Sequence, residues 1–276
     1  MRFAVCLFLI WGSTSGRSVS GSTLSTEFYV TGNYESGPTQ TYVVDMDDFT
    51  VDRQWAWQNS QEAAIAVLDT VKQHGVFHPD LGTEYTLAGQ PTGTTYPGHG
   101  LTGGQFGRRF YDATTDGNHI YAWDYEFGSA FRFDLNWSNP VELFNVPGQA
   151  DFMGITYDPT NDSLWVSGWD LQTIRNYTLG GVLLSSFDPG SMLNSALALN
   201  PLDGTLWFSA FGTSQFQNFS KSGTFLGSEA APADLFGGEI VAVPEPRPLL
   251  SLLVILFSTV ILFRVSKPMG LRPNSI

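Results

Sequence analysis

The sequence predicts an all-β domain, and three features of its central part lead to this prediction. Short apolar runs of four to seven residues alternate with clusters of turn-forming residues, and one such pattern returns after 42 residues. Hydrophobic residues make up 42% of the 276-residue chain and aromatic residues 14%, while only 14% are charged. This composition can form a large buried core and excludes wholesale disorder.

The repeat is visible in the order of residues. Residues 155–159 (ITYDP) and 197–201 (LALNP) lie 42 apart, and the same offset relates 164–167 (LWVS) to 206–209 (LWFS). A third, looser copy covers 110–135. A repeat of 20 to 50 residues indicates a modular architecture in which each unit packs on its neighbours.

Each copy contains four short runs typical of strands. In the central copy we expect strands at about 153–157, 163–168, 173–179 and 182–187. Four strands in roughly 40 to 45 residues form one blade of a β-propeller. The 42-residue repeat, applied to the domain from 26 to 243, gives about five four-stranded blades.

The two ends of this domain complete one blade together. Residues 238–243 resemble the first strand of a blade, and 28–32, 41–45 and 50–55 resemble the other three. Pairing them closes the ring and leaves no open sheet edge between the ends.

The segment from 60 to 104 admits two interpretations. A strand at 63–68, followed by strands at 83–87 and 94–96, would form a blade, whereas a helix over 61–74 also fits the local signals. We favour the blade because it completes the count.

Residues 1–20 have the pattern of a secretory signal peptide. A basic start is followed by an apolar run over 3–11 and then by small polar residues. The single cysteine, Cys6, lies inside the apolar run, so the mature protein is expected to contain no disulfide and no thiolate site.

The C-terminal region contains a second apolar run at 249–263, which we interpret as a transmembrane helix. Val243, Pro244, Glu245 and Pro246 precede it, and Arg264 follows it. This arrangement, from 243 to 267, resembles the PEP-CTERM sorting signal of exported bacterial proteins. The resemblance implies that an exosortase recognises and processes the tail, and residues 268–276 extend beyond it. An ordinary single-span anchor with a proline-rich stalk is the alternative.

Acidic turns at 112–116 and 158–162 suggest calcium ligands. The EF-hand spacing is absent, and turn propensity alone explains Asp and Asn in such hairpins. His74 and His78 lie four residues apart without a third ligand at zinc spacing, and we interpret them as exposed loop residues. We therefore expect no cofactor and no metal site, with calcium as the alternative, and we nominate no catalytic residue.

Tryptophans fall into two groups. Trp123, Trp165 and Trp207 occupy equivalent repeat positions and should pack between blades. Trp137, Trp169 and Phe211 lie outside the strict pattern or beside loops, where their rings are candidates for stacking on sugars.

The charge restricts the partners. The chain carries a net charge of −13, and the segment 21–243, with 25 acidic and 7 basic residues, carries −18. Such a surface excludes nucleic acid, which needs a basic face. It also disfavours anionic polysaccharides, leaving neutral glycans, cations or proteins.

These observations predict an exported bacterial protein of the cell envelope, outer surface or extracellular matrix, held transiently in the inner membrane before processing. We expect the propeller to be a binding or structural module without catalytic activity. The alternatives are a metal-dependent propeller enzyme, similar to a lactonase or a lyase, and a plain membrane-anchored ectodomain.

Overall fold

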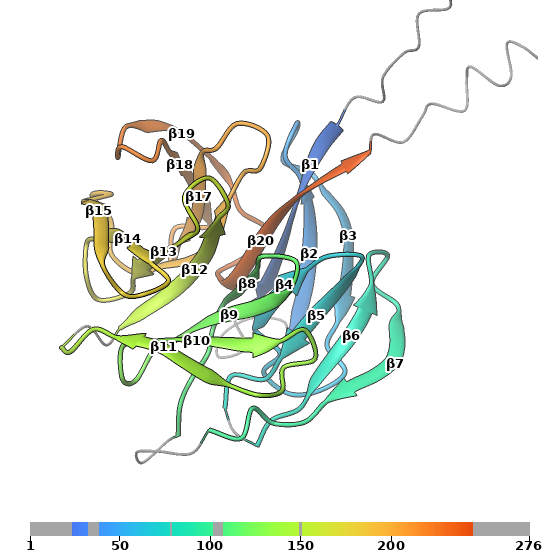
Figure 1. Cartoon of the computed structure of the whole chain (residues 1–276). Helices are drawn as coiled ribbons and strands as arrows, with labels where there is room; N and C mark the ends of the chain where they lie inside the picture. Colours follow the sequence, from blue (N-terminus) through green and yellow to red (C-terminus); the bar gives the residue numbers. More distant parts are fainter. Residues whose placement is uncertain (1–23, 33–38, 78, 102–106, 149–150, 245–276) are drawn as a thin grey trace, which may run out of the picture. The chain divides into compact units, whose positions relative to one another are not determined.

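The computed structural model describes residues 24–32, 39–77, 79–101, 107–148 and 151–244, which form twenty β-strands (Figure 1). In chain order, these are β1 (Leu24–Gly32), β2 (Gln40–Asp45), β3 (Val51–Ala56), β4 (Ala64–Val67), β5 (Thr70–His74), β6 (Gly82–Thr86), β7 (Pro91–Tyr96), β8 (Ala113–Thr115), β9 (His119–Asp124), β10 (Ser129–Asp134), β11 (Val141–Asn145), β12 (Phe152–Asp158), β13 (Ser163–Gly168), β14 (Ile174–Thr178), β15 (Leu183–Phe187), β16 (Asn194–Leu199), β17 (Leu206–Ala210), β18 (Gln215–Phe219), β19 (Phe225–Ala230) and β20 (Leu235–Pro244).

The strands form five four-stranded antiparallel sheets, which are the blades of a β-propeller. Blade 1 contains β20, β1, β2 and β3, and the other blades each contain four consecutive strands: β4–β7 in blade 2, β8–β11 in blade 3, β12–β15 in blade 4 and β16–β19 in blade 5. Figure 1 shows the first strands of the blades gathered around a common centre. The predicted five-bladed, four-stranded architecture is confirmed.

Blade 1 joins the two ends of the domain, as the sequence predicts. Strand β20 lies beside β1, which continues to β2 and β3 in the same sheet. The last strand of the domain therefore supplies the innermost strand of the first blade. Pairing of the two ends closes the ring of blades through the hydrogen bonds of one sheet.

The segment from 60 to 104, for which the sequence allowed either a helix over 61–74 or a blade, forms blade 2. Strands β4 and β5 form an antiparallel hairpin in which Ala64 faces His74 and Val67 faces Val71. All four residues of β4 are buried, because the inner strand of a blade has a neighbouring blade on each face. The prediction omitted β5, whose polar residues Lys72 and Gln73 obscure the strand pattern.

The repeated tryptophans pack between blades, as predicted. Trp123 of blade 3 contacts Phe152 of blade 4, with ring centroids 5.5 Å apart. Trp165 of blade 4 belongs to a buried cluster with residues of blade 5, and Trp207 of blade 5 belongs to one with residues of blade 1. Each indole therefore fills the space between its own blade and the next.

Trp137 differs from its expected role as a sugar-stacking residue. It is only 1% exposed, and its ring lies 5.4 Å from Phe133 and 4.9 Å from His74 of blade 2. The turn after β10 directs this indole toward the neighbouring blade, where burial of a large ring is favourable. The interpretation of Trp137 as a binding residue was wrong.

Candidate functional site

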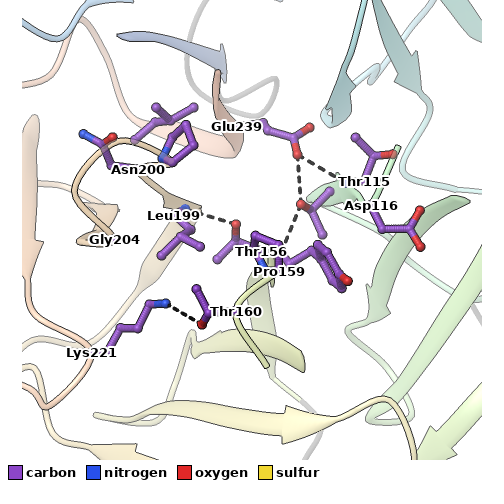
Figure 2. A pocket seen from close by; sticks show the side chains of 14 residues that line it. Thr115, Asp116, Thr156, Pro159, Thr160, Leu199, Asn200, Gly204, Lys221 and Glu239 are labelled. Carbon is purple, nitrogen blue, oxygen red and sulfur yellow. Dashed lines mark hydrogen bonds between the residues drawn. The ribbon is translucent and has the colours of Figure 1, made fainter. Parts of the chain in front are cut away.

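A pocket of about 300 Å³ opens at one mouth of the central channel (Figure 2). We call this end the pocket mouth, because the turns between the first and second strands of blades 3, 4 and 5 lie there. Its lining residues come from four blades and are Thr114, Thr115, Asp116, Thr156, Tyr157, Pro159, Thr160, Leu199, Asn200, Pro201, Gly204, Lys221, Glu239 and Ile240.

Glu239 lines this pocket from the innermost strand of blade 1 and is only 8% exposed. The amide of Val67 donates to its Oε2 at 2.7 Å, and the hydroxyl of Thr114 donates to its Oε1 at 2.9 Å. The amide of Thr115 also donates to Oε1, at 3.2 Å. Burial raises the pKa of Glu239 to about 8, although the three donors act in the opposite direction.

Threonine hydroxyls extend this hydrogen-bond network around the channel. The amide of Tyr157 donates to Thr114 Oγ1 at 3.1 Å, and the amide of Leu199 donates to Thr156 Oγ1 at 3.0 Å. Thr114 and Thr156 are 42 residues apart, so the repeat makes the same contact between successive blades twice. The equivalent residue of blade 5 is Ala198, which has no hydroxyl.

Asp112 lies deeper in the channel and joins four blades. Its carboxylate accepts amide hydrogen bonds at 2.8 to 3.2 Å from Ala113, Ile155, Leu197 and Gly238. Burial raises the pKa of Asp112 well above its usual range, and the nearby Glu239 adds to this effect. The carboxylate is therefore a structural acceptor for the inner strands, and not a member of an exposed turn as the sequence suggested.

The turn at 158–162 places Asp158 against a cation of the neighbouring blade. Lys221 Nζ lies 2.7 Å from Asp158 Oδ2, which also accepts the indole N–H of Trp165 at 3.1 Å. Although burial opposes it, hydrogen bonds from Lys221, Thr160 and Trp165 lower the pKa of Asp158. Asp116, in the equivalent turn of blade 3, accepts from the Tyr121 hydroxyl at 2.8 Å.

The histidines have local partners. His74 and His99 are buried, so the expectation of an exposed loop was wrong for His74, and His78 lies outside the described residues. The two nitrogens of His74 face the carbonyl oxygens of Gly75 and Pro97, each at 2.9 Å. Within the described ranges, no group of three or more His, Cys, Asp or Glu side chains is arranged to hold a metal ion.

Aromatic rings occupy the opposite end of the channel, which we call the aromatic mouth. Trp169 and Phe211, which follow the second strands of blades 4 and 5, have centroids 4.9 Å apart. Phe211 stacks on Phe236 at 6.0 Å, and Tyr111 lies 5.2 Å from the same ring. Trp169 and Phe211 are half-buried and contact one another, so much of their apolar surface is already covered.

Backbone hydrogen bonds link successive blades at the aromatic mouth. The amide of Asp151 donates to Tyr125 O at 3.0 Å between blades 4 and 3, and the amide of Leu193 donates to Trp169 O at 2.6 Å between blades 5 and 4. Asp151 and Leu193 lie 42 residues apart and share a positive φ, of 71° and 59°. The repeat therefore closes this end with the backbone as well as with aromatic rings.

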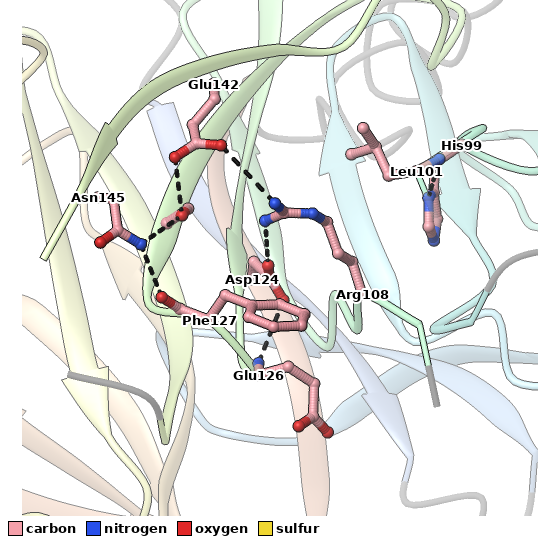
Figure 3. Close-up of polar contacts among 9 residues, drawn as sticks. His99, Leu101, Arg108, Asp124, Glu126, Phe127, Glu142 and Asn145 are labelled. Atoms are coloured by element: carbon pink, nitrogen blue, oxygen red, sulfur yellow. Dashed lines mark hydrogen bonds and ion pairs between the residues drawn. The ribbon is translucent and has the colours of Figure 1, made fainter. Parts of the chain in front are cut away.

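A polar cluster on blade 3 was not predicted from the sequence (Figure 3). Arg108 forms ion pairs with Asp124 at 2.5 Å and Glu142 at 3.7 Å, and its guanidinium lies 4.8 Å from the centroid of Phe131. Burial raises the pKa of Asp124 to about 6, while Arg108 opposes this shift. The single guanidinium thus connects the segment before β8 to strands β9 and β11 of blade 3.

The predicted sorting residues lie at or beyond the end of the domain. Val243 and Pro244 are the last residues of β20, which ends one residue beyond the strand predicted at 238–243. A proline is tolerated at this position because the strand ends there. Glu245, Pro246, Arg264, the segment 249–263 and residues 1–20 lie outside the described residues. The part of the chain that is described contains no helix suited to crossing a membrane.

Comparison with known proteins supports the fold alone. No family model matches the chain, and no curated protein matches it. A structure from a nidogen/laminin complex is similar with a TM-score of 0.51 and 12% identity, over 79% of this chain and 98% of that one. A functionally unknown protein from Desulfotomaculum acetoxidans has a TM-score of 0.50 and 17% identity, over 79% and 88%. At these identities the likeness shows a shared β-propeller.

Proposed function

We propose that this protein is an exported binding module that catalyses no reaction, and that its C-terminal tail sorts it to the cell envelope or the extracellular matrix. The observation that carries the non-catalytic assignment is the state of the two channel carboxylates. Asp112 accepts four amide hydrogen bonds, and Glu239 accepts three hydrogen bonds from amides and a hydroxyl.

This arrangement disfavours a metal-dependent enzyme. Such an enzyme would use channel carboxylates as ligands, and calcium requires six to eight oxygen atoms around it. Asp112 and Glu239 instead direct their oxygens at protein donors from neighbouring blades. The pocket beside Glu239 remains open to a ligand, and concave sites of this size commonly bind small molecules.

Metal removal tests the non-catalytic assignment. We expect the thermal unfolding midpoint of the purified protein to stay the same after treatment with EDTA, because the fold requires no ion at its centre. EDTA already saturated with calcium is the control for effects other than chelation. A midpoint that falls on chelation and recovers with added calcium would favour the metal-dependent enzyme, since a bound ion stabilises the folded state by mass action.

The sorting assignment is supported by the order of segments in the sequence. The last strand of the propeller ends at Pro244, the first residue of the Pro-Glu-Pro motif, and the apolar run and Arg264 follow. A processing site beside the end of β20 would release the propeller without removing a strand. The signal-like residues 1–20 would supply the export that such sorting requires.

A double substitution tests the sorting assignment. We expect the variant Glu245→Ala with Pro246→Ala, made in a host that carries an exosortase, to accumulate unprocessed in the membrane fraction. Pro244 is left unchanged because it belongs to β20, and Pro248→Ala is the matched control. Normal processing and secretion of the double variant would contradict the proposal. Retention of the wild type as well would favour the plain membrane anchor.

A further inference from the structure

The pocket has an excess of negative charge in its immediate surroundings. Its charged lining residues are Asp116, Lys221 and Glu239. Lys221 is neutralised by Asp158, which lies 2.7 Å away and is itself 1% exposed. The carboxyl groups of Asp116 and, once it is ionised, Glu239 therefore set the sign of the field that a ligand would meet.

Glu239 is the unusual member of this pair, because it is a buried acid on the wall of a cavity. Within the described part of the chain, its hydrogen-bond donors are two backbone amides and the hydroxyl of Thr114, and none of them is a cationic side chain. Amides stabilise a carboxylate, but they do not neutralise its charge. A buried carboxylate without a cation is costly, so an incoming cation would be strongly favoured there.

The rest of the wall determines what kind of cation fits. Leu199 and Ile240 present apolar side chains, and Pro159 and Pro201 present rings, around the same space. Among the described residues, no three His, Cys, Asp or Glu side chains are arranged to hold a metal ion here. An ammonium group attached to a carbon body would instead place its charge near Glu239 and its carbons against the apolar residues.

We propose that the pocket binds a small organic ammonium ion, with the charged nitrogen beside Glu239 and the apolar body against Leu199, Ile240 and the two prolines. Figure 2 shows Glu239, Thr156 and Leu199 facing this space from three different blades, which allows a ligand to contact all three. The net charge of −18 on the segment 21–243 would attract such a cation from solution. This inference rests on the proposed binding function and adds the chemical class of the ligand.

Binding of cyclohexylammonium, with cyclohexanol as the uncharged counterpart of similar size, tests the proposal by calorimetry. A primary amine stays protonated below about pH 10, so between pH 7 and pH 9 the ligand keeps its charge while the carboxyl of Glu239 ionises. With the pKa of Glu239 at about 8, we expect the affinity for cyclohexylammonium to rise about tenfold over this interval. Cyclohexanol should bind weakly at both pH values.

Two Glu→Gln variants, one inside the pocket and one outside it, distinguish binding at the pocket from attraction by the overall negative charge of the protein. Glu239→Gln should remove the pH dependence and most of the binding, whereas Glu229→Gln, on the exposed strand β19, should change neither. Should Glu239→Gln fail to fold, calorimetry of the wild-type protein in buffers of different ionisation enthalpy still decides, because binding at pH 7 should release close to one proton.

Three results would overturn the inference. These are cyclohexanol binding as tightly as cyclohexylammonium, cyclohexylammonium binding that is absent or independent of pH, and binding without proton release at pH 7. None of them concerns processing of the tail or the effect of EDTA, so the ligand class and the proposed function are tested separately.

Discussion

The two mouths of the channel are built from the same five inner strands, yet they differ in what they leave open. At the pocket mouth, hydroxyl and carboxyl groups such as Thr114, Thr156 and Glu239 bond to neighbouring backbones and border a cavity. At the aromatic mouth, Trp169 and Phe211 pack against Phe236. One repeat therefore supplies both an end filled by aromatic rings and a polar end able to accept a ligand.

The inner strands of neighbouring blades lie close together at the aromatic mouth. Gly237 follows Phe236 in β20, and a Cβ atom added to it would lie 2.3 Å from the carbonyl oxygen of Ala63 in the neighbouring blade. The inner strands approach one another too closely there for a side chain at this position. Stability should therefore depend more strongly on the aromatic mouth than on the pocket mouth.

Removing the central ring of the aromatic mouth should have the largest effect. Phe236→Ala deletes a side chain that is 2% exposed and contacts three other rings, so we expect the free energy of unfolding to fall by about 3 kcal/mol. Urea denaturation measures this loss. Phe225→Ala, at a residue that is 55% exposed on β19, is the matched control and should change stability by less than about 0.5 kcal/mol.

Equal losses from the two phenylalanine substitutions would show that packing at the aromatic mouth adds nothing special to stability. Cyclohexylammonium binding sharpens the comparison, because Phe236→Ala should leave it unchanged as long as the protein is folded. Loss of binding in a folded Phe236→Ala protein would show that the two ends are coupled through the inner strands.

The blades were predictable because their signals are local and repeated. The turn at 158–162 and its counterpart at 200–204 place Asp or Asn next to proline, and Trp165 and Trp207 follow at the same distance. The pairing of β20 with β1 was also predictable, since each end of the domain contained an incomplete blade. Repetition thus revealed the architecture without any single strongly diagnostic strand.

The channel carboxylates were not predictable, because their partners are distant in sequence. Glu239 accepts from Val67, 172 residues away, and Asp112 accepts from Gly238, 126 residues away. Asp112 also begins a run that looks like an acidic turn, which concealed its buried role. Trp137 was misinterpreted for the same reason, since the blade that buries it is separate in the chain from its own turn.

The smaller effect concerns the pH dependence of stability at the pocket mouth. The pKa of Glu239 is raised from its usual 4.5 to about 8 in the folded protein, so the folded state holds a proton that the unfolded chain releases. Its contribution to stability is therefore complete below about pH 4.5 and is lost as the pH rises through 8. Between pH 7 and pH 9, we expect the free energy of unfolding to decrease by about 1.4 kcal/mol through this group.

The comparison of wild type with Glu239→Gln measures the contribution of the Glu239 carboxyl together with its effect on Asp112, whose pKa it raises. Urea denaturation at pH 7 and pH 9 should show a larger loss for the wild type, while Glu229→Gln should behave as the wild type does. Parallel losses in all three proteins would mean that Glu239 is already ionised at pH 7. In that case its three donors outweigh burial, cyclohexylammonium should bind equally well at pH 7 and pH 9, and the inference drawn for the pocket is overturned as well. The stability measurement and the binding measurement depend on the same proton of Glu239. Both must therefore place its loss in the same pH range.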